Sequence, residues 1–198
     1  MQYVIVGLGN PGEEYEGTRH NTGRRVLEQF RKKYDFPEWE KDKNLKALLS
    51  KGTFGKEKKK VVLVEPDNYM NLSGKSISSL IKNSKDAERT VVVYDDLDLP
   101  LGTMRISFNR SSGGHKGLES VIKALKTTAF ARLRIGISPT TASGKLKKPK
   151  GEDATIDFII GKYKKAEIPA IDKTAKKAAE ALGLILEIGR EQATGQVN

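Results

Sequence analysis

The sequence contains no cysteine among its 198 residues. A disulfide framework, a cysteine-ligated zinc or iron–sulfur site and a thiol nucleophile are therefore excluded. No apolar run approaches the roughly 18–20 residues that span a bilayer, and the start, MQYVIVGLGN, lacks the basic segment of a signal peptide. We therefore expect a cytoplasmic protein without a membrane partner, or one from an organelle matrix if a transit segment has been removed.

Acidic residues are in the minority, with 25 Asp and Glu against 36 Lys and Arg, which gives a net charge of +11. Such an excess favours polyanionic partners, either nucleic acid or an anionic surface, although charge also serves solubility alone. The length is that of one domain with a core large enough to be stable without cross-links.

The hydrophobic pattern alternates between short β-branched runs and amphipathic stretches, which predicts an α/β fold. We expect a single domain over residues 1–190, with a mixed, mainly parallel twisted sheet flanked by helices on both faces, and a frayed tail over 191–198. The predicted strands are 2–6, 45–49, 61–64, 91–94, 103–108 and 132–137. The predicted helices are 21–34, capped by Asn21, and 72–81, 117–125 and 168–188, and a loop is predicted over 142–152.

Two glycine motifs look like nucleotide sites but fail on context. The segment 7–12, GLGNPG, matches the dinucleotide fingerprint, but Pro11 and three glutamates, Glu13, Glu14 and Glu16, follow where a helix should receive a pyrophosphate. The segment 74–76, GKS, ends like a P-loop, yet position 69, where its first glycine belongs, holds a tyrosine. We therefore disfavour a dinucleotide-binding module and reject the P-loop interpretation.

His20 and His115 are the only candidates for a histidine general base. A histidine base gains from a carboxylate that fixes its tautomer and stabilises the imidazolium, and Asp95 and Asp96 follow a predicted strand. The same aspartates are also typical of a polar strand exit, and no local spacing forces them against His20.

Asn10 and Asn71 stand at predicted strand or helix borders. Asparagine in such places is commonly a cap or a turn residue. It can also orient a water molecule or bind a developing oxyanion without changing its charge. The sequence pattern alone leaves both interpretations open.

Five stretches of the sequence match, in order, the motifs of one known family. They are VGLGNPGEEYEGTRHNTG (6–23), EPDNYMNLSGK (65–75), YDDLDLPLG (94–102), SSGGHKGLES (111–120) and RLRIGI (132–137). Over nearly its full length the chain resembles bacterial-type peptidyl-tRNA hydrolase.

The resemblance implies hydrolysis of the ester that joins a peptide to the 3′-terminal ribose of tRNA, without metal or other cofactor and without a covalent intermediate. His20 matches the general base that activates water, and Asp95 matches the carboxylate that holds it. Asn10 matches a residue near the scissile group, and Asn71 matches a substrate-orienting asparagine. The residues that match the walls of the cleft are Tyr15, Tyr69 and Met70.

The resemblance also implies a tRNA-binding surface for the acceptor stem and 3′ end, built on phosphate contacts with little base reading. One residue departs from the family pattern, because Lys116 stands where the family usually has asparagine. Lysine donates but cannot accept a hydrogen bond, so we expect altered affinity rather than lost chemistry. The residues implied in substrate or tRNA binding are His115, Lys116, Arg105, Arg110, Arg134 and the loop 145–150, with Lys145 at its start.

The leading interpretation is thus a monomeric esterase without an obligate protein partner. The alternative is a non-catalytic RNA-binding relative of the same fold, of the splicing-cofactor type. The intact His20–Asp95 pair favours the enzyme, because a binding protein does not need a base. The loop Ser143–Gly151, rich in glycine and lysine, is predicted to act as a lid.

Overall fold

The computed structural model of the chain describes residues 2–198 and contains one seven-stranded sheet. Its strands are β1 (Gln2–Gly7), β2 (Glu40–Asp42), β3 (Ala47–Phe54), β4 (Lys59–Pro66), β5 (Thr90–Pro100), β6 (Met104–Phe108) and β7 (Ala131–Ser138). The α-helices are α1 (Thr22–Lys33), α2 (Ser84–Glu88), α3 (Lys116–Leu125), α4 (Glu152–Ile160), α5 (Ile168–Ile188) and α6 (Arg190–Val197). Short 3₁₀ helices are η1 (Glu13–Tyr15), η2 (Arg19–Asn21) and η3 (Met70–Ser76).

The strands are arranged in the order β2-β3-β4-β1-β5-β7-β6. The four central strands, β4, β1, β5 and β7, run parallel, whereas β2, β3 and β6 pair antiparallel at the two edges. This confirms the predicted single α/β domain with a mixed sheet. The carboxyl ends of the four parallel strands meet at one edge, where ligands collect in such sheets.

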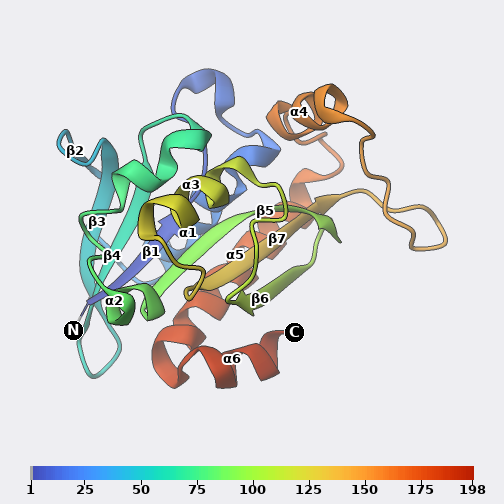
Figure 1. Ribbon diagram of the computed structural model, residues 1–198. Helices are drawn as coiled ribbons and strands as arrows, with labels where there is room; N and C mark the ends of the chain where they lie inside the picture. Colours follow the sequence, from blue (N-terminus) through green and yellow to red (C-terminus); the bar gives the residue numbers. More distant parts are fainter. Residues whose placement is uncertain (1) are drawn as a thin grey trace.

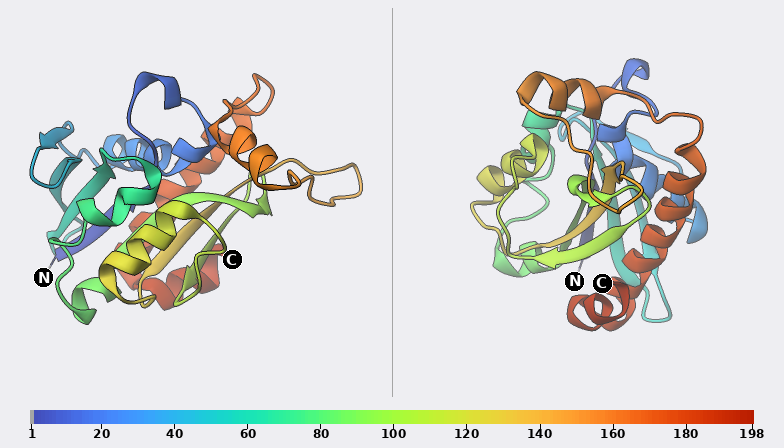
Figure 2. Two further views of the ribbon diagram at one scale, coloured as in Figure 1. Left: turned by 45° about the horizontal axis from the view of Figure 1, so that its top comes forward. Right: turned by 90° about the vertical axis from the view of Figure 1, so that its right-hand side faces the viewer.

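Both faces of the sheet are buried. Successive side chains of a strand point to opposite faces, so the apolar side chains of the central strands pack into two separate layers. Ile5 and Val93 belong to one apolar cluster, with α1 and α5, whereas Val6 and Val92 belong to another, with η3 and α3. In Figure 1, α3 lies in front of the sheet and α1 and α5 lie behind it, and Figure 2 shows the same layers from two other sides. Among residues 2–198, no helix has the length and apolar character needed to cross a membrane.

Close packing explains the glycine motif that resembles a dinucleotide fingerprint. A Cβ atom on Gly7 would lie 2.7 Å from the carbonyl oxygen of Gly23, and one on Gly23 would lie 2.4 Å from that of Val93. Two glycines thus allow the start of α1 to rest directly on β1 and β5. Gly12 has a φ of 105°, which favours glycine on its own account.

The segment predicted as a helix over 72–81 is instead the 3₁₀ helix η3, which begins at Met70 and ends at Ser76. The N–H of Gly74 donates to Ser120 Oγ on α3, at 3.0 Å, and a Cβ on Gly74 would clash with the Ser120 carbonyl oxygen at 2.1 Å. This contact between segments, rather than an i→i−4 ladder, sets the local conformation. The glycine of the P-loop-like GKS therefore serves close packing against α3.

The last eight residues, 191–198, were expected to fray, and the structure corrects this expectation. They lie almost entirely in α6, which packs against α5 and beside β6, and Ala193 is fully buried. The side chain of Asn198 donates to the carbonyl of Ile106 at 2.9 Å and accepts from its N–H at 2.8 Å. The amide thereby satisfies backbone groups at the edge of the sheet, which hydrophobic patterning does not reveal. The short elements β2, α2 and α4 were also not predicted.

Candidate active site

The candidate site lies just past the carboxyl ends of β1 and β4 and beside the middle of β5, between the helical layers on the two faces of the sheet. Asn10 follows β1, Met70 and Asn71 follow β4, and Asp95 lies in the middle of β5. His20 lies in η2, directly before α1, and His115 caps the start of α3. The fold therefore brings together residues from four of the five motif stretches, which local spacing alone could not show.

Asp95 is shared by the two histidines. His20 Nδ1 lies 3.0 Å from each carboxylate oxygen of Asp95, and His115 Nε2 lies 3.1 Å from Oδ1. The imidazole centroids are 4.9 Å apart, and the side chain of Asp95 is almost completely buried. Because α1 and α3 lie on opposite faces of the sheet, the carboxylate is held from both sides.

The partners of each ring assign its tautomer. His115 Nδ1 accepts from the N–H of Leu118 at 3.2 Å, so its Nε2 carries the proton and donates to Asp95. An ionised carboxylate only accepts, so His20 Nδ1 also donates to Asp95. His20 Nε2 is then left without a proton, and it makes no hydrogen bond within residues 2–198. This nitrogen is the free basic atom of the site.

The electrostatics keep Asp95 ionised despite its burial. Burial alone would raise the pKa of Asp95, but the attraction of its carboxylate to the N–H groups of His20 and His115, and the hydrogen bonds that these groups donate, outweigh burial and hold this pKa below its usual range. A carboxylate that stays charged near neutral pH keeps both histidine N–H groups directed toward it. The arrangement thus fixes the base before any substrate binds.

Arg19 anchors the segment that carries His20. It is buried, it donates to the carbonyls of Gly161 and Lys162 at 3.2 and 3.0 Å, and its Nη2 lies 2.7 Å from Glu167. Its guanidinium also stacks on the ring of Phe158 in α4, with Cζ 4.3 Å from the ring centroid. These contacts fasten η2 to the α4–α5 connection, 139 to 148 residues further along the chain.

Asn10 makes hydrogen bonds to two neighbouring segments, and the sequence did not predict the one with Asn21. Its Oδ1 accepts from the N–H of Met70 at 2.7 Å, which orients the amide and leaves Nδ2 without a protein partner within residues 2–198. Asn21 binds the backbone of Asn10 twice, by accepting from its N–H at 2.8 Å and donating to its carbonyl at 3.0 Å. The predicted role of Asn21 as a helix cap is therefore wrong, since its side chain makes no cap hydrogen bond. The local sequence, an asparagine directly before a helix, is the same whether the side chain caps the helix or binds the backbone of Asn10.

The remaining residues expected in the cleft surround this centre with different exposures. Met70 is buried, Tyr15 is partly buried, and Tyr69 is 60% exposed. Asn71 is exposed and its side chain makes no hydrogen bond within residues 2–198, so unlike the backbone of Met70 it is not held against Asn10. The structure thus places a preformed polar centre beside an apolar, partly open wall.

The basic residues fall into two groups. Arg105 and Arg134 are opposite each other on β6 and β7, and Arg134 Nε donates to Asp96 at 2.6 Å. Lys116 is exposed at the first position of α3, next to His115. By contrast, Lys145 lies on the loop between β7 and α4, which projects from the body of the molecule in Figure 1, so it is not gathered with the others.

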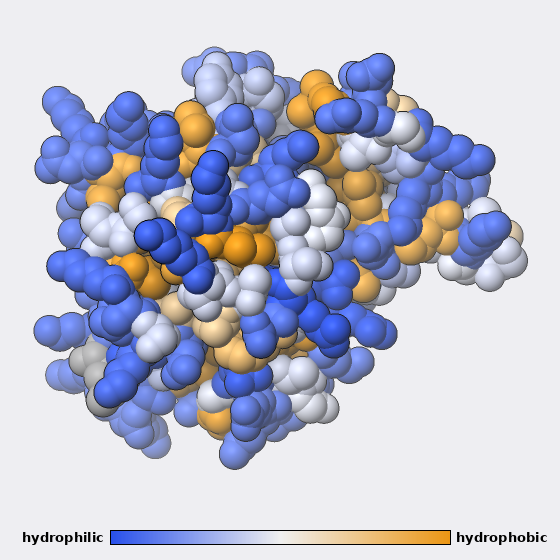
Figure 3. All heavy atoms as spheres, in the orientation of Figure 1, coloured by the Kyte–Doolittle hydropathy of each residue, from blue (hydrophilic) through white to orange (hydrophobic). Residues whose placement is uncertain are grey.

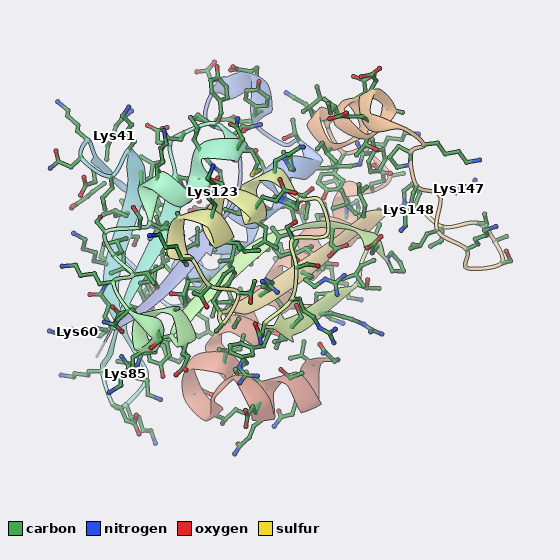
Figure 4. The ribbon with its side chains drawn as sticks, in the orientation of Figure 1. Lys41, Lys60, Lys85, Lys123, Lys147 and Lys148 are labelled. Carbon is green, nitrogen blue, oxygen red and sulfur yellow. The ribbon has the colours of Figure 1, made fainter. Side chains whose placement is uncertain are left out.

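Positive charge is spread well beyond this site. Figure 4 places Lys147 and Lys148 on the projecting loop, whereas Lys41 and Lys60 lie at the opposite side of the molecule. Figure 3, in the same orientation, shows that the face toward the viewer is mainly hydrophilic, with hydrophobic atoms exposed in its central part. A nucleic acid bound over this face would meet lysines from many elements, which suits contacts to phosphates more than to bases.

The cluster His20–Asp95–His115 is also the group within residues 2–198 that could hold a metal ion, since one ligand atom from each lies within 4.8 Å of the others. A metal at His20 Nδ1 would leave the proton on Nε2. Metal binding and a free basic nitrogen are therefore alternatives for this ring. The expectation of a metal-free reaction stays a prediction.

Comparison with known proteins decides the family. The profile of the family described as peptidyl-tRNA hydrolase matches residues 4–198. The chain belongs to the peptidyl-tRNA hydrolase family. It is 40% identical over 188 residues to a peptidyl-tRNA hydrolase from Alkaliphilus oremlandii, which covers 94% of each chain, and 38% identical over 209 residues to one from Aquifex aeolicus, which covers 98% and 95%.

A solved structure of this family has the same fold. The peptidyl-tRNA hydrolase of Acinetobacter baumannii matches with a TM-score of 0.85 and 31% identity, over 99% of this chain and 94% of that one. Family membership confirms the resemblance stated from the five motifs.

Proposed function

We propose that this protein hydrolyses the ester between a peptide, or an N-blocked amino acid, and the 3′-terminal ribose of tRNA, and so recycles tRNA in translation. The observation that carries the proposal is the pairing of His20 Nδ1 with the buried Asp95 carboxylate, which leaves Nε2 free as a base. The family membership and the similarity to proteins named peptidyl-tRNA hydrolase support the same substrate.

In the proposed reaction, His20 Nε2 takes a proton from a water molecule as its oxygen attacks the ester carbonyl carbon. Asp95 stabilises the imidazolium that forms, and such general base catalysis contributes roughly 10²–10⁴-fold. The tetrahedral intermediate then collapses, the bond to the ribose oxygen breaks, and the proton passes from His20 to that oxygen. The reaction balances with water alone, so we propose neither a metal nor another cofactor.

The side chains around the base have complementary proposed roles. Asn10 keeps its Nδ2 donor free of protein partners within residues 2–198 and Asn71 has an exposed amide, so we propose that one of them stabilises the oxyanion of the intermediate. We propose that Tyr69, Met70 and Tyr15 line the space for the peptide and the terminal nucleotide. Ester hydrolysis needs little acid assistance because an alkoxide leaves more easily than an amide anion.

We further propose that arginine and lysine side chains bind the tRNA acceptor stem and 3′ end through phosphates. Arg105 and Arg134 form one basic pair on the sheet, Lys116 adds a charge beside His115, and Lys145 extends the surface onto the loop. Binding of this kind weakens steeply as salt is raised. Lid closure by the loop 143–151 remains a prediction, and proteolytic nicking there that tRNA leaves unchanged would contradict it.

The non-catalytic RNA-binding alternative is not favoured, because a protein that only binds RNA has no use for a buried carboxylate that orients a free imidazole. A monomer in the cytoplasm, with no obligate protein partner, remains our proposal for the working form.

The experiment that tests the function uses a tRNA charged with an N-acetylated amino acid, with the unblocked aminoacyl-tRNA as the substrate control. The wild-type protein should release the acetylated amino acid, and His20→Ala should lower the rate by roughly 10²–10⁴-fold. Absence of release by the wild type, or undiminished release by His20→Ala, would contradict the proposal.

A further inference from the structure

Arg24, which no motif of the family singles out in this sequence, lies beneath the segment that carries Asn10. A Cβ atom on Gly9 would lie 2.8 Å from Arg24 Cδ and 2.9 Å from its Nε, so the side chain runs directly under that glycine. The Nε is buried and has no hydrogen-bond partner within residues 2–198. At its far end, Nη2 donates to the carbonyl oxygen of Pro66.

These contacts join two segments of the active site at a second point. Gly9 is directly followed by Asn10, and Pro66 ends β4 and begins the segment that leads to Met70 and Asn71. At the first point, the N–H of Met70 donates to Asn10 Oδ1 at 2.7 Å. At the second point, the side chain of Arg24 packs against Gly9 and donates to the carbonyl oxygen of Pro66.

A buried carboxylate accompanies this arginine. Glu65 precedes Pro66, it is only 6% exposed, and its carboxylate makes no hydrogen bond within residues 2–198. It lines a hollow of about 560 Å³ that Arg24, Asn21 and Trp39 also line. Burial is the largest influence on Arg24 and lowers its pKa, whereas Glu65 and then Asp67 act in the opposite direction. Glu65 is thus the main counter-charge of a guanidinium that has few other partners.

We propose that Arg24 is a positioning residue for the proposed ester hydrolysis, which fixes the Asn10 segment relative to the Pro66–Asn71 segment while Glu65 supplies its counter-charge. The inference rests on the proposed function for its kinetic consequences. Asn10 and Asn71 approach one substrate from these two segments, so their separation decides whether both amides reach it. Misplacement of a catalytic group by about 1 Å can lower a rate by as much as 10²-fold.

The kinetic test compares Arg24→Ala and Arg24→Lys with Arg25→Ala as the matched control. Arg25 is the next residue of α1 and lines the same hollow, but it pairs with Asp172 on α5 rather than with the active-site segments. Arg24→Ala should lower kcat by about tenfold or more while KM changes less than about threefold. Arg24→Lys, which keeps the charge and a donor for Pro66, should recover most of kcat, and Arg25→Ala should match the wild type.

Unchanged kcat in Arg24→Ala would overturn the inference. So would a loss that Arg24→Lys fails to recover, or one that Arg25→Ala shows equally, because these results would indicate packing of α1 alone. Rates are normalised to the folded fraction measured by circular dichroism at the assay temperature.

A second readout does not depend on activity. The side-chain amide signals of Asn10, followed by ¹⁵N NMR, should shift or broaden in Arg24→Ala and return in Arg24→Lys, whereas signals of Asn198, at the far edge of the sheet, stay fixed. Asn10 signals that are identical in Arg24→Ala and the wild type would overturn the inference. If the wild type fails to hydrolyse the ester, the proposed function fails, yet this readout still decides whether Arg24 positions Asn10.

Discussion

Asp95 and Glu65 are buried carboxylates at the same edge of the sheet, on strands that flank β1, and their environments have opposite effects. Asp95 accepts hydrogen bonds from two histidines, and its pKa lies below the usual range. Glu65 accepts none, and burial raises its pKa to about 7, although Arg24 opposes this. Burial therefore does not decide the charge state of a carboxylate here. The number of donors directed at it does.

The two carboxylates therefore have different chemical behaviour although they lie in one region of the molecule. Asp95 remains a fixed negative charge that orients a base, as hydrolysis at neutral pH requires. Glu65 changes its charge near neutral pH and has no donor that ties it to one state. Each prediction below tests whether this difference comes from the donors.

The largest effect is expected from Asp95→Asn, which removes the charge but keeps the shape. The asparagine would present an N–H group or a neutral oxygen to His20, so the ring would lose its fixed tautomer and the support of the imidazolium. We predict a fall in kcat of roughly 10³–10⁴-fold with the fold preserved. Hydrolysis of an N-acetyl-aminoacyl-tRNA and circular dichroism measure the two quantities, and a rate within threefold of the wild type would remove Asp95 from the mechanism.

Glu65→Gln tests the other carboxylate through stability. The pKa of Glu65 is about 7 in the folded protein against 4.5 in the unfolded chain, so its ionisation destabilises the fold as pH rises from about 4.5 to about 7. Arg24, Glu28 and Arg31 on α1 are the charged groups that face it. At pH 8 we predict that Glu65→Gln unfolds in urea with a free energy up to about 3 kcal/mol higher than the wild type.

At pH 4 this advantage of Glu65→Gln should nearly disappear, because the wild-type carboxyl is then mostly neutral in both states. Asp95 should behave in the opposite way, since a lowered pKa adds stability above the unfolded value near 3.8 that is lost as pH falls through the folded value. An advantage of Glu65→Gln that is equal at both pH values would show that ionisation of Glu65 is not the cause.

A smaller effect is expected from His115→Asn, which removes one donor from Asp95 while keeping an oxygen able to cap α3. Asparagine is a good N-cap residue, so stability should change by less than about 1 kcal/mol. We predict a fall in kcat of about tenfold, because His20 still holds the carboxylate. His115→Ala, which also loses the cap, serves as the comparison for stability. A kcat for His115→Asn equal to that of the wild type would mean that one donor suffices.

The sequence pattern predicted more of the scaffold than of the site. β-branched runs predicted the central strands because both faces of β1 and β5 are buried. The segment 72–81 was assigned wrongly because a contact of Gly74 with α3, distant in sequence, sets its conformation. The tail 191–198 was assigned wrongly because few apolar residues mark it, while the side chain of Asn198 holds it to β6.

Within the site, family resemblance identified His20, Asp95 and Asn10, and the structure shows how they meet. The double contact of Asn21 with Asn10 and the sharing of Asp95 by His115 follow from the approach of separate segments. No periodicity or local spacing reports such an approach. The same holds for Arg24 and Glu65, which resemble ordinary members of a helix and a strand until the hollow between them is seen.

The tautomers of the two imidazole rings can be measured directly by ¹⁵N NMR near pH 8, and the spectrum is simple to assign because the chain has only two histidines. We expect neutral His20 to carry its proton on Nδ1, with Nε2 unprotonated, and His115 to carry its proton on Nε2. A neutral His20 with its proton on Nε2 would rule out this nitrogen as the general base, because it would already be protonated.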